Sequence, residues 1–311
     1  VWTPLKFSEA GVREVHSKFF NPFKNVVVND MMLDEFGKKM SKSVGNIVDP
    51  VEMMEKYGAD NIRWYMLYTS PVWTPLKFSE AGVREVHSKF FNPFKNTYTF
   101  FQTYANIDQI NIEDCKVKYE DREEIDKWLL SKYNHLIKKV REFYEAYDLN
   151  LVVREITNFV SEDLSNWYIR RNRNRFWGSD MNTSKKSVYI TTYEVMEGLC
   201  RLCAPIIPYL TEEIYTKLTK KKSVHLADFP VCSKELINEE LEYKMDLVRD
   251  LITMGRNIRE ESKIKVRQPI KSVMLESSLK EKISGLESLI KEELNVKEVL
   301  YVDDVNLYMN I

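Results

Sequence analysis

Apolar residues recur every three or four positions through residues 121–147, and this spacing constrains the fold more than any other feature of the chain. The positions are Ile125, Trp128, Leu129, Tyr133, Leu136, Ile137, Val140 and Tyr144. Such spacing gathers apolar side chains on one face of an α-helix. Similar patterns predict helices over about 151–177, which Gly178 ends, and over 187–203 and 211–218. Successive amphipathic helices of this kind predict an antiparallel helix bundle.

The composition agrees with a mainly helical, water-soluble fold. Nine Gly and ten Pro are few among 311 residues, while 44% hydrophobic and 30% charged residues are ordinary for a protein with a buried core. The net charge of −1 predicts that any RNA binding depends on local basic stripes. Since no signal peptide and no membrane-spanning run are visible, we expect a cytoplasmic protein without a membrane partner.

The four cysteines predict neither a disulfide framework nor a zinc site. Cys200 and Cys203 lie in an apolar helical run without a second pair nearby, and a structural zinc ion needs four ligands. We expect free, buried thiols in a reducing compartment, and no metal site.

Residues 72–96 repeat residues 1–25 letter for letter. An ancient repeat would have diverged, so the pattern does not indicate a solenoid. The second copy continues into a helical pattern, whereas the first runs into Val26, Val27 and Val28, which are typical of a strand. We therefore expect residues 1–25 to be an artefact of cloning or sequence assembly rather than a native copy.

The rest of the chain divides into three predicted domains. Residues 26–96 should form a small α/β region, with a strand pair turning at Asn29-Asp30 and a helix that begins at Asp49-Pro50 and stops at Gly58. Residues 97–235 should be the helix bundle. Residues 236–311 should be a small α/β appendage, with helices over 239–263 and 279–294 and strands over 273–276 and 296–302.

A short basic loop, Gly37-Lys38-Lys39-Met40-Ser41-Lys42-Ser43-Val44-Gly45-Asn46, lies within the first of these domains. Lysine is a compact cation with three donors and is suited to phosphate, and glycines at both ends allow hinge motion. The pattern predicts a mobile phosphate-binding loop in which Lys39 and Lys42 are the main donors and Ser41 and Ser43 the smaller ones. A solvated lysine turn is the alternative.

The stretch 163–177 combines arginines with aromatic residues. Its candidate RNA-binding residues are Trp167, Arg170, Arg171, Arg173, Arg175 and Trp177. Arginine makes bidentate contacts to phosphate, and tryptophan offers a stacking surface for unpaired bases. A buried tryptophan beside a charged helix end explains the same residues equally well.

Several stretches of the chain resemble class I aminoacyl-tRNA synthetases of the isoleucine, valine and leucine group. They are GKKMSKSVGNIVDP, EKYGADNIRWYMLYTSPVWTPLKF, DLSNWYIRRNRNRFW, APIIPYLTEEIY, SVHLADFP and IKVRQP, in the order of that family. The isoleucine-specific members are the most similar, because of WTPLKFSEAGV, NPFKNTYTFF and IRRNRNRFW.

This resemblance implies an ATP-dependent ligase that charges isoleucine tRNA through an isoleucyl-adenylate. It implies that Lys39, Met40, Ser41, Lys42 and Ser43 bind ATP, with Lys39 and Lys42 catalytic and Mg²⁺ accompanying the nucleotide. Residues 50–95 would resemble the stem-contact fold and 97–235 the anticodon-binding domain, so that Trp167, Arg170, Arg171, Arg173, Arg175 and Trp177 would lie near the anticodon arm. We expect a monomer.

The sequence also departs from that family. It contains no His-Ile-Gly-His type motif, nucleotide-binding half, inserted editing domain or zinc-binding extension. We therefore expect this chain to be inactive alone. Two alternatives remain: a stand-alone tRNA-binding module without catalysis, and a valine-specific synthetase.

Overall fold

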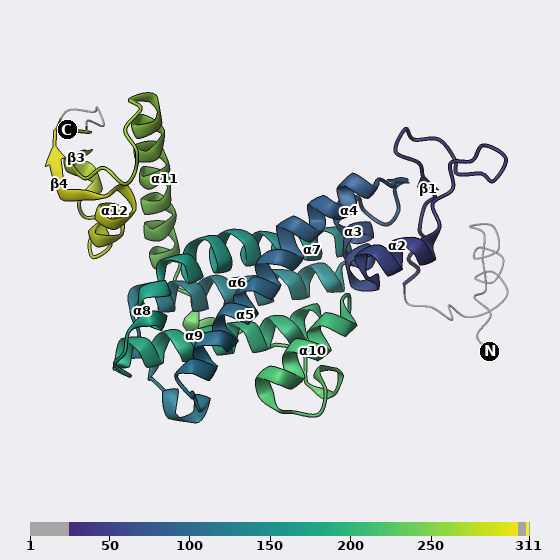
Figure 1. The fold of residues 1–311 in the computed structure, drawn as a ribbon, viewed down its shortest axis with the longest axis horizontal. Coiled ribbons are helices and arrows are strands. Elements are labelled where there is room, and N and C mark those ends of the chain that lie inside the picture. The colour runs from purple at the N-terminus through teal and green to yellow at the C-terminus, as the bar shows by residue number, and fades with distance from the viewer. Residues whose placement is uncertain (1–24, 304–308, 311) are drawn as a thin grey trace. The chain divides into compact units, whose positions relative to one another are not determined.

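The computed structural model describes residues 25–303, 309 and 310, and the chain within it is mainly α-helical, as the sequence predicts. It divides into two compact units (Figure 1). Of the described residues, one unit comprises 25–86 and 143–154, and the other comprises 87–142, 155–303, 309 and 310. Apart from Asn25, the prediction for residues 1–25 lies outside the described residues, and the boundaries at 96/97 and 235/236 stay predictions.

The first unit contains a two-stranded parallel sheet and three short helices. Strand β1 (Met32–Leu33) pairs with β2 (Leu76–Lys77), and helices α2 (Pro50–Tyr57), α3 (Ala59–Thr69) and α4 (Glu80–Val86) accompany them. Helix α2 begins as predicted, because the Asp49 carboxylate accepts hydrogen bonds from the backbone N–H groups of Val51 and Glu52.

The strand pair expected at 26–33 does not form. The backbone of 30–33 is instead hydrogen-bonded to residues 72–78, as in Asp30 N–H to Val72 O (3.0 Å) and Leu76 N–H to Met31 O (3.0 Å). The extended segment between Pro71 and Phe78 therefore supplies the partner strand. Local alternation of residues carries no signal for a partner so distant in the chain.

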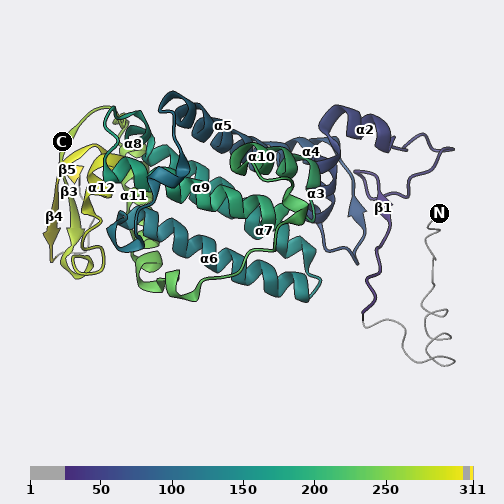
Figure 2. The same ribbon diagram turned by 90° about the horizontal axis from the view of Figure 1, so that it is seen from below.

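The second unit is built on a bundle of helices. Its long members are α5 (Asn92–Ile107), α6 (Glu124–Glu145), α9 (Thr183–Cys203) and α10 (Pro208–Thr219). Helix α9 contacts both α5 and α10, and Figures 1 and 2 show α5 and α9 running side by side. Helices α6 and α9 approach closely where Gly198 faces Tyr133, since a Cβ at Gly198 would lie 1.7 Å from the Tyr133 hydroxyl. Cys200 and Cys203 are buried, unpaired thiols in α9, as predicted.

The helix predicted over about 151–177 forms with a changed register. It comprises α7 (Leu149–Asn158), the π-helical segment η4 (Phe159–Ile169) and α8 (Arg173–Trp177). The turn before α8 lies at Asn172, whose side chain donates to Tyr168 O at 2.8 Å. Local spacing does not distinguish a π-helix from an α-helix over this length.

The remaining elements of this unit form the appendage. Helix α11 (Glu239–Glu261) precedes a sheet of order β4-β3-β5, in which β3 (Ile270–Glu276) pairs parallel with β4 (Val296–Val302) and antiparallel with β5 (Met309–Asn310). The helix expected over 279–294 is shorter, because Gly285 has a φ of 87° and α12 covers only Glu287–Leu294.

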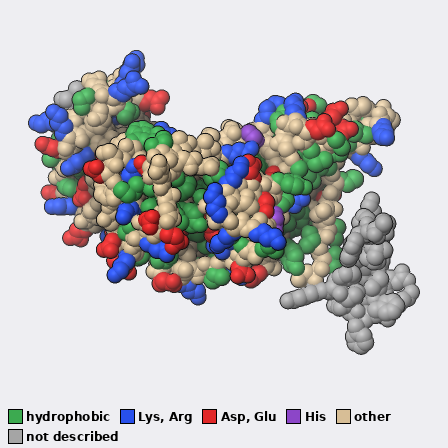
Figure 3. Space-filling view, turned by 60° about the horizontal axis from the view of Figure 1, so that its bottom comes forward, with side chains coloured by type: hydrophobic (Ala, Val, Ile, Leu, Met, Phe, Trp, Pro, Cys, Tyr) green, Lys and Arg blue, Asp and Glu red, His purple; other side chains and the backbone are tan. Residues whose placement is uncertain are grey.

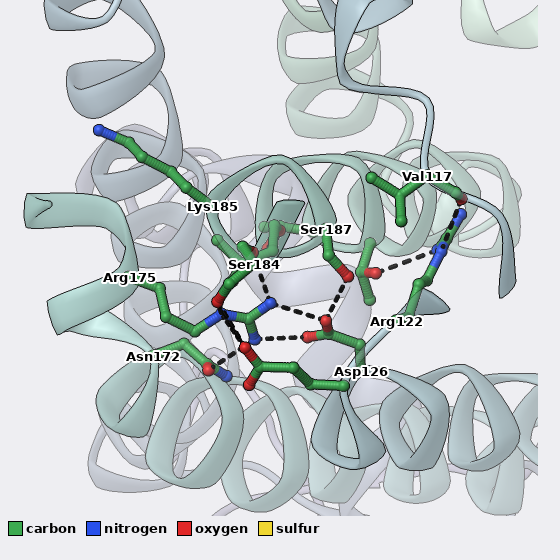
Figure 4. Close-up of polar contacts among 12 residues, drawn as sticks. Val117, Arg122, Asp126, Asn172, Arg175, Ser184, Lys185 and Ser187 are labelled. Carbon is green, nitrogen blue, oxygen red and sulfur yellow. Dashed lines mark hydrogen bonds and ion pairs between the residues drawn. The ribbon is translucent and has the colours of Figure 1, made fainter. Parts of the chain in front are cut away.

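The helices of the bundle converge on a fully buried carboxylate, that of Asp126 in α6 (Figure 4). The Arg175 guanidinium donates to both of its oxygens at 2.8 Å, the Tyr168 hydroxyl donates at 2.7 Å and the Ser187 hydroxyl at 2.5 Å. These donors come from α8, η4 and α9. The buried charge is therefore both paired and hydrogen-bonded, which is the condition for tolerating it in a core.

We expect Asp126→Asn to lower the free energy of unfolding by about 3–5 kcal/mol, because it removes the buried counter-charge of Arg175 and leaves only the half-exposed Glu123, 3.5 Å from its Nε. Urea denaturation followed by tryptophan fluorescence measures this change. The matched control is Asp250→Asn, at an exposed position of α11, which should change stability by less than about 0.5 kcal/mol. Equal effects of the two substitutions would contradict this account of the bundle.

Candidate active-site loop and nucleic-acid interface

The base of the lysine loop is organised by Asp34. One oxygen of its carboxylate accepts hydrogen bonds from the backbone N–H groups of Phe36 (3.0 Å) and Lys38 (2.7 Å), and the other accepts from the Asn46 side chain (2.8 Å). The Asn46 hydrogen bond, followed by that from the Lys38 backbone, lowers the pKa of Asp34. The carboxylate therefore stays ionised and joins the start of the loop to its end.

Asn46 also holds the backbone of the loop itself. Its side-chain oxygen accepts from the Ser41 N–H at 2.9 Å, and its side-chain nitrogen donates to Lys39 O at 3.2 Å. Lys39 forms an isolated antiparallel bridge with Leu33 as well. The chain on either side of Met40 is therefore held by a side chain and by a neighbouring strand residue.

The side chains of three predicted phosphate donors in this loop are open to solvent. Lys39, Lys42 and Ser43 are exposed, and no side-chain partner of either lysine is found among the described residues. The hydroxyls of Ser41 and Ser43 lie 2.6 Å apart. Gly37 and Gly45 have φ of 80° and 73°, a conformation that favours glycine. Two uncommitted ammonium groups with adjacent hydroxyls fit the oxygens of a phosphate chain.

The helix that follows the loop is anchored at its far end. The Glu80 carboxylate in α4 accepts hydrogen bonds from Lys56 Nζ (2.5 Å) and from the Tyr57 hydroxyl, both at the end of α2. Arg84 donates to the same carboxylate at 3.1 Å. Helix α2 is therefore capped by Asp49 at the loop and tied to α4 at its other end.

The arginines of the 163–177 stretch differ in what they contact. Arg175 binds Asp126, and its Nη2 also donates to Ser184 O at 2.6 Å (Figure 4). Arg170 and Arg171 bind Glu293 of α12 at 2.9 and 2.6 Å. Only Arg173 is both exposed and, within the described residues, without a hydrogen-bond or ion-pair partner.

Glu293 is the shared ion-pair partner of two arginines of this stretch. Besides Arg170 and Arg171, it binds Arg256 of α11, and its side chain is only 6% exposed. Burial raises the pKa of Glu293, but the three arginines together hold it below its usual value. The carboxylate is therefore ionised, and it fixes α12 against the end of η4.

The two tryptophans of the stretch also occupy different environments. Trp167 is 5% exposed, and the guanidinium groups of Arg171 and Arg249 each lie 5.4 Å from its ring centroid. Trp177, the last residue of α8, is 55% exposed. The buried ring belongs to the packing of the bundle, whereas the exposed one is available for stacking.

Sequence reasoning missed the role of four residues that hold the lysine loop and the 163–177 stretch in place: Asp34, Asn46, Asp126 and Glu293. A signal existed only for Asp34, because Asp at the first and Gly at the fourth position of Asp34-Glu35-Phe36-Gly37 is typical of a type I turn. The other three act through partners distant in the chain, or through backbone geometry that spacing does not encode.

Lys and Arg side chains are intermixed with Asp and Glu over the surface that Figure 3 shows. Binding of a polyanion would therefore rest on local contacts. No cluster of three or more His, Cys, Asp or Glu residues suited to a metal ion occurs among the described residues. None of the helices described is long and apolar enough to cross a membrane.

Two family models match the chain. Residues 7–79 match the class I tRNA synthetases for isoleucine, leucine, methionine and valine, and residues 126–275 match the anticodon-binding domain of tRNA ligases. The first segment includes the lysine loop. The second includes nearly all of α6, the arginine-rich stretch and the start of the appendage.

Curated relatives support the same assignment. The isoleucine–tRNA ligase of Cytophaga hutchinsonii is 40% identical over 97% of this chain and 29% of its own length. That of Pyrococcus furiosus is 38% identical over 90% of this chain and 27% of its own length. The chain therefore spans less than a third of these relatives.

One solved structure shares the fold. It is a ternary complex of an Agrobacterium radiobacter LeuRS with tRNA and LeuAMS, which matches 73% of this chain and 27% of its own with a TM-score of 0.55 and 21% identity. The sequence matches and the shared fold agree: the chain carries a segment similar to the class I tRNA synthetases for isoleucine, leucine, methionine and valine, followed by an anticodon-binding domain of the tRNA ligases.

Proposed function

We propose that this chain is part of an ATP-dependent ligase that charges isoleucine tRNA through an isoleucyl-adenylate. The observation that carries the proposal is that one chain holds both the lysine loop and an anticodon-binding domain, with 38–40% identity to isoleucine–tRNA ligases. Its buried free thiols support a reducing, cytoplasmic location. We further propose a monomer and Mg²⁺ bound with ATP.

The loop would act in adenylate formation. The isoleucine carboxylate attacks the α-phosphorus of ATP, a new C–O–P linkage forms, and the bond to the pyrophosphate leaving group breaks. Negative charge grows on that leaving group. Lys39 and Lys42, with Ser41, Ser43 and the backbone of Met40, would donate to its oxygens and stabilise the transition state more than the ground state. The exposure of both lysines supports this role.

The helical unit would bind the anticodon arm. We propose that Arg173 and Trp177 contact RNA directly, with Arg170 at the edge of the contact, since its side chain is 39% exposed. Trp167, Arg171 and Arg175 would hold the binding surface in shape through Arg249, Glu293 and Asp126. A stand-alone tRNA-binding module would not need the loop, and a valine-specific enzyme would differ in the amino acid that it activates.

Lys42→Ala in the full-length gene product should slow isoleucyl-adenylate formation by about 100-fold, equivalent to about 3 kcal/mol of transition-state stabilisation, with a smaller effect on ATP affinity. Single-turnover measurement of adenylate formation reports this rate. Lys38→Ala is the matched control, because Lys38 is an exposed lysine of the same loop, and its side chain, unlike its backbone N–H, has no assigned role. An unchanged rate in Lys42→Ala would refute the assignment of the loop.

Binding of isoleucine tRNA to this chain should weaken steeply with salt, because phosphate contacts release counterions. Arg173→Ala should reduce the slope of log affinity against log salt by about 1, which a fluorescence titration at several salt concentrations measures. Lys297→Ala, at an exposed position of β4, should leave the slope unchanged. Salt-independent binding would argue against an RNA interface at this surface.

A further inference from the structure

The hydrogen bonds of the lysine loop divide it into two parts. Residues 39–41 are held by Asn46, which faces the backbone on both sides of Met40, and by the bridge from Lys39 to Leu33. Asn46 is in turn held by Asp34 at 2.8 Å. This chain of contacts connects the first part of the loop to the strand that precedes it.

Residues 42–45 have only local contacts within the part of the chain that is described. The backbone N–H groups of Val44 and Gly45 donate to Ser41 O at 3.2 and 3.1 Å, and the Ser43 N–H donates to Ser41 Oγ at 3.2 Å. Lys42, Ser43 and Val44 are exposed. Beyond Gly45 and its two chain neighbours, no atom lies within 4 Å of a Cβ built on Gly45, so there is open space beside the tip at this position.

Only a carboxamide provides all the contacts that Asn46 makes. Its nitrogen donates to Asp34 and to Lys39 O, while its oxygen accepts from Ser41 N–H. A carboxylate at this position has no donor and would face the Asp34 carboxylate with like charge. The short side chain of alanine reaches none of these groups.

We propose that Asn46 is a positioning residue that keeps residues 39–41 fixed while residues 42–45 move onto the phosphates. The proposal rests on the function proposed above and assigns different roles to its two lysines. Lys39 is held in place before ATP binds, whereas Lys42 arrives with the moving tip. Because residues 39–41 are ordered before ATP binds, closure has to order only residues 42–45, which lowers the entropic cost of reaching the transition state.

Asn46→Asp in the full-length gene product tests this role. We expect kcat for isoleucine-dependent ATP–pyrophosphate exchange to fall about tenfold or more, with little change in KM for isoleucine. Amide hydrogen exchange should accelerate at residues 39–41 and stay unchanged in α2 and α3. Asn29→Ala, which removes an exposed amide from the same unit, should change neither measurement.

A double variant that exchanges the two side chains, Asp34→Asn with Asn46→Asp, separates the contact to Lys39 O from the other contacts of Asn46. The new carboxamide at position 34 still accepts from the Phe36 and Lys38 N–H groups and donates to the new carboxylate at position 46. That carboxylate in turn accepts from the Ser41 N–H, and only the contact to Lys39 O is lost. The double variant should therefore recover part of the kcat lost in Asn46→Asp.

Two results would overturn the inference. One is a kcat of Asn46→Asp within twofold of the parent. The other is unchanged amide exchange at residues 39–41, which needs no activity. If the parent lacked isoleucine-dependent exchange, the proposed function would fail, while amide exchange would still decide whether Asn46 holds the loop.

Discussion

The buried carboxylate of Asp126 is the interaction on which the helical unit depends. Arg175, Tyr168 and Ser187 reach it from α8, η4 and α9, so these elements must assemble around α6 for the charge to be satisfied. This ion pair fixes Arg175 in α8, the helix that ends at the exposed Trp177.

Most arginines of that segment form ion pairs within the protein, so its arginine content does not by itself indicate an RNA-binding surface. Arg170 and Arg171 fix the appendage through Glu293, and Arg175 fixes the bundle. The sequence left RNA contact and a charged helix end as equal alternatives, and the structure shows that the same segment includes internal partners and outward-facing groups. Counting the arginines of such a segment therefore overestimates its phosphate contacts unless those paired with buried carboxylates are left out.

Local sequence pattern was sufficient to predict helices α6, α9 and α11 and strand β4, because each carries its own apolar pattern or cap. It was not sufficient for β1, whose partner lies more than forty residues away and pairs through the backbone. The lysine loop was recognisable from its amino-acid sequence, but the contacts of Asp34 and Asn46 that hold its base were not. The hydrogen bonds that Asn46 donates to Lys39 O and accepts from the Ser41 N–H depend on loop dihedral angles that residue spacing does not specify.

We propose that the two units serve the charging of isoleucine tRNA. Aminoacylation of isoleucine tRNA by the full-length gene product, with isoleucine and valine supplied in parallel at equal concentration, tests it most directly. The account predicts charging with isoleucine and at least tenfold weaker use of valine, since a missing methylene in an apolar pocket changes kcat/KM by about 10–200-fold. Equal or preferred charging with valine, or no charging with either amino acid, would contradict it.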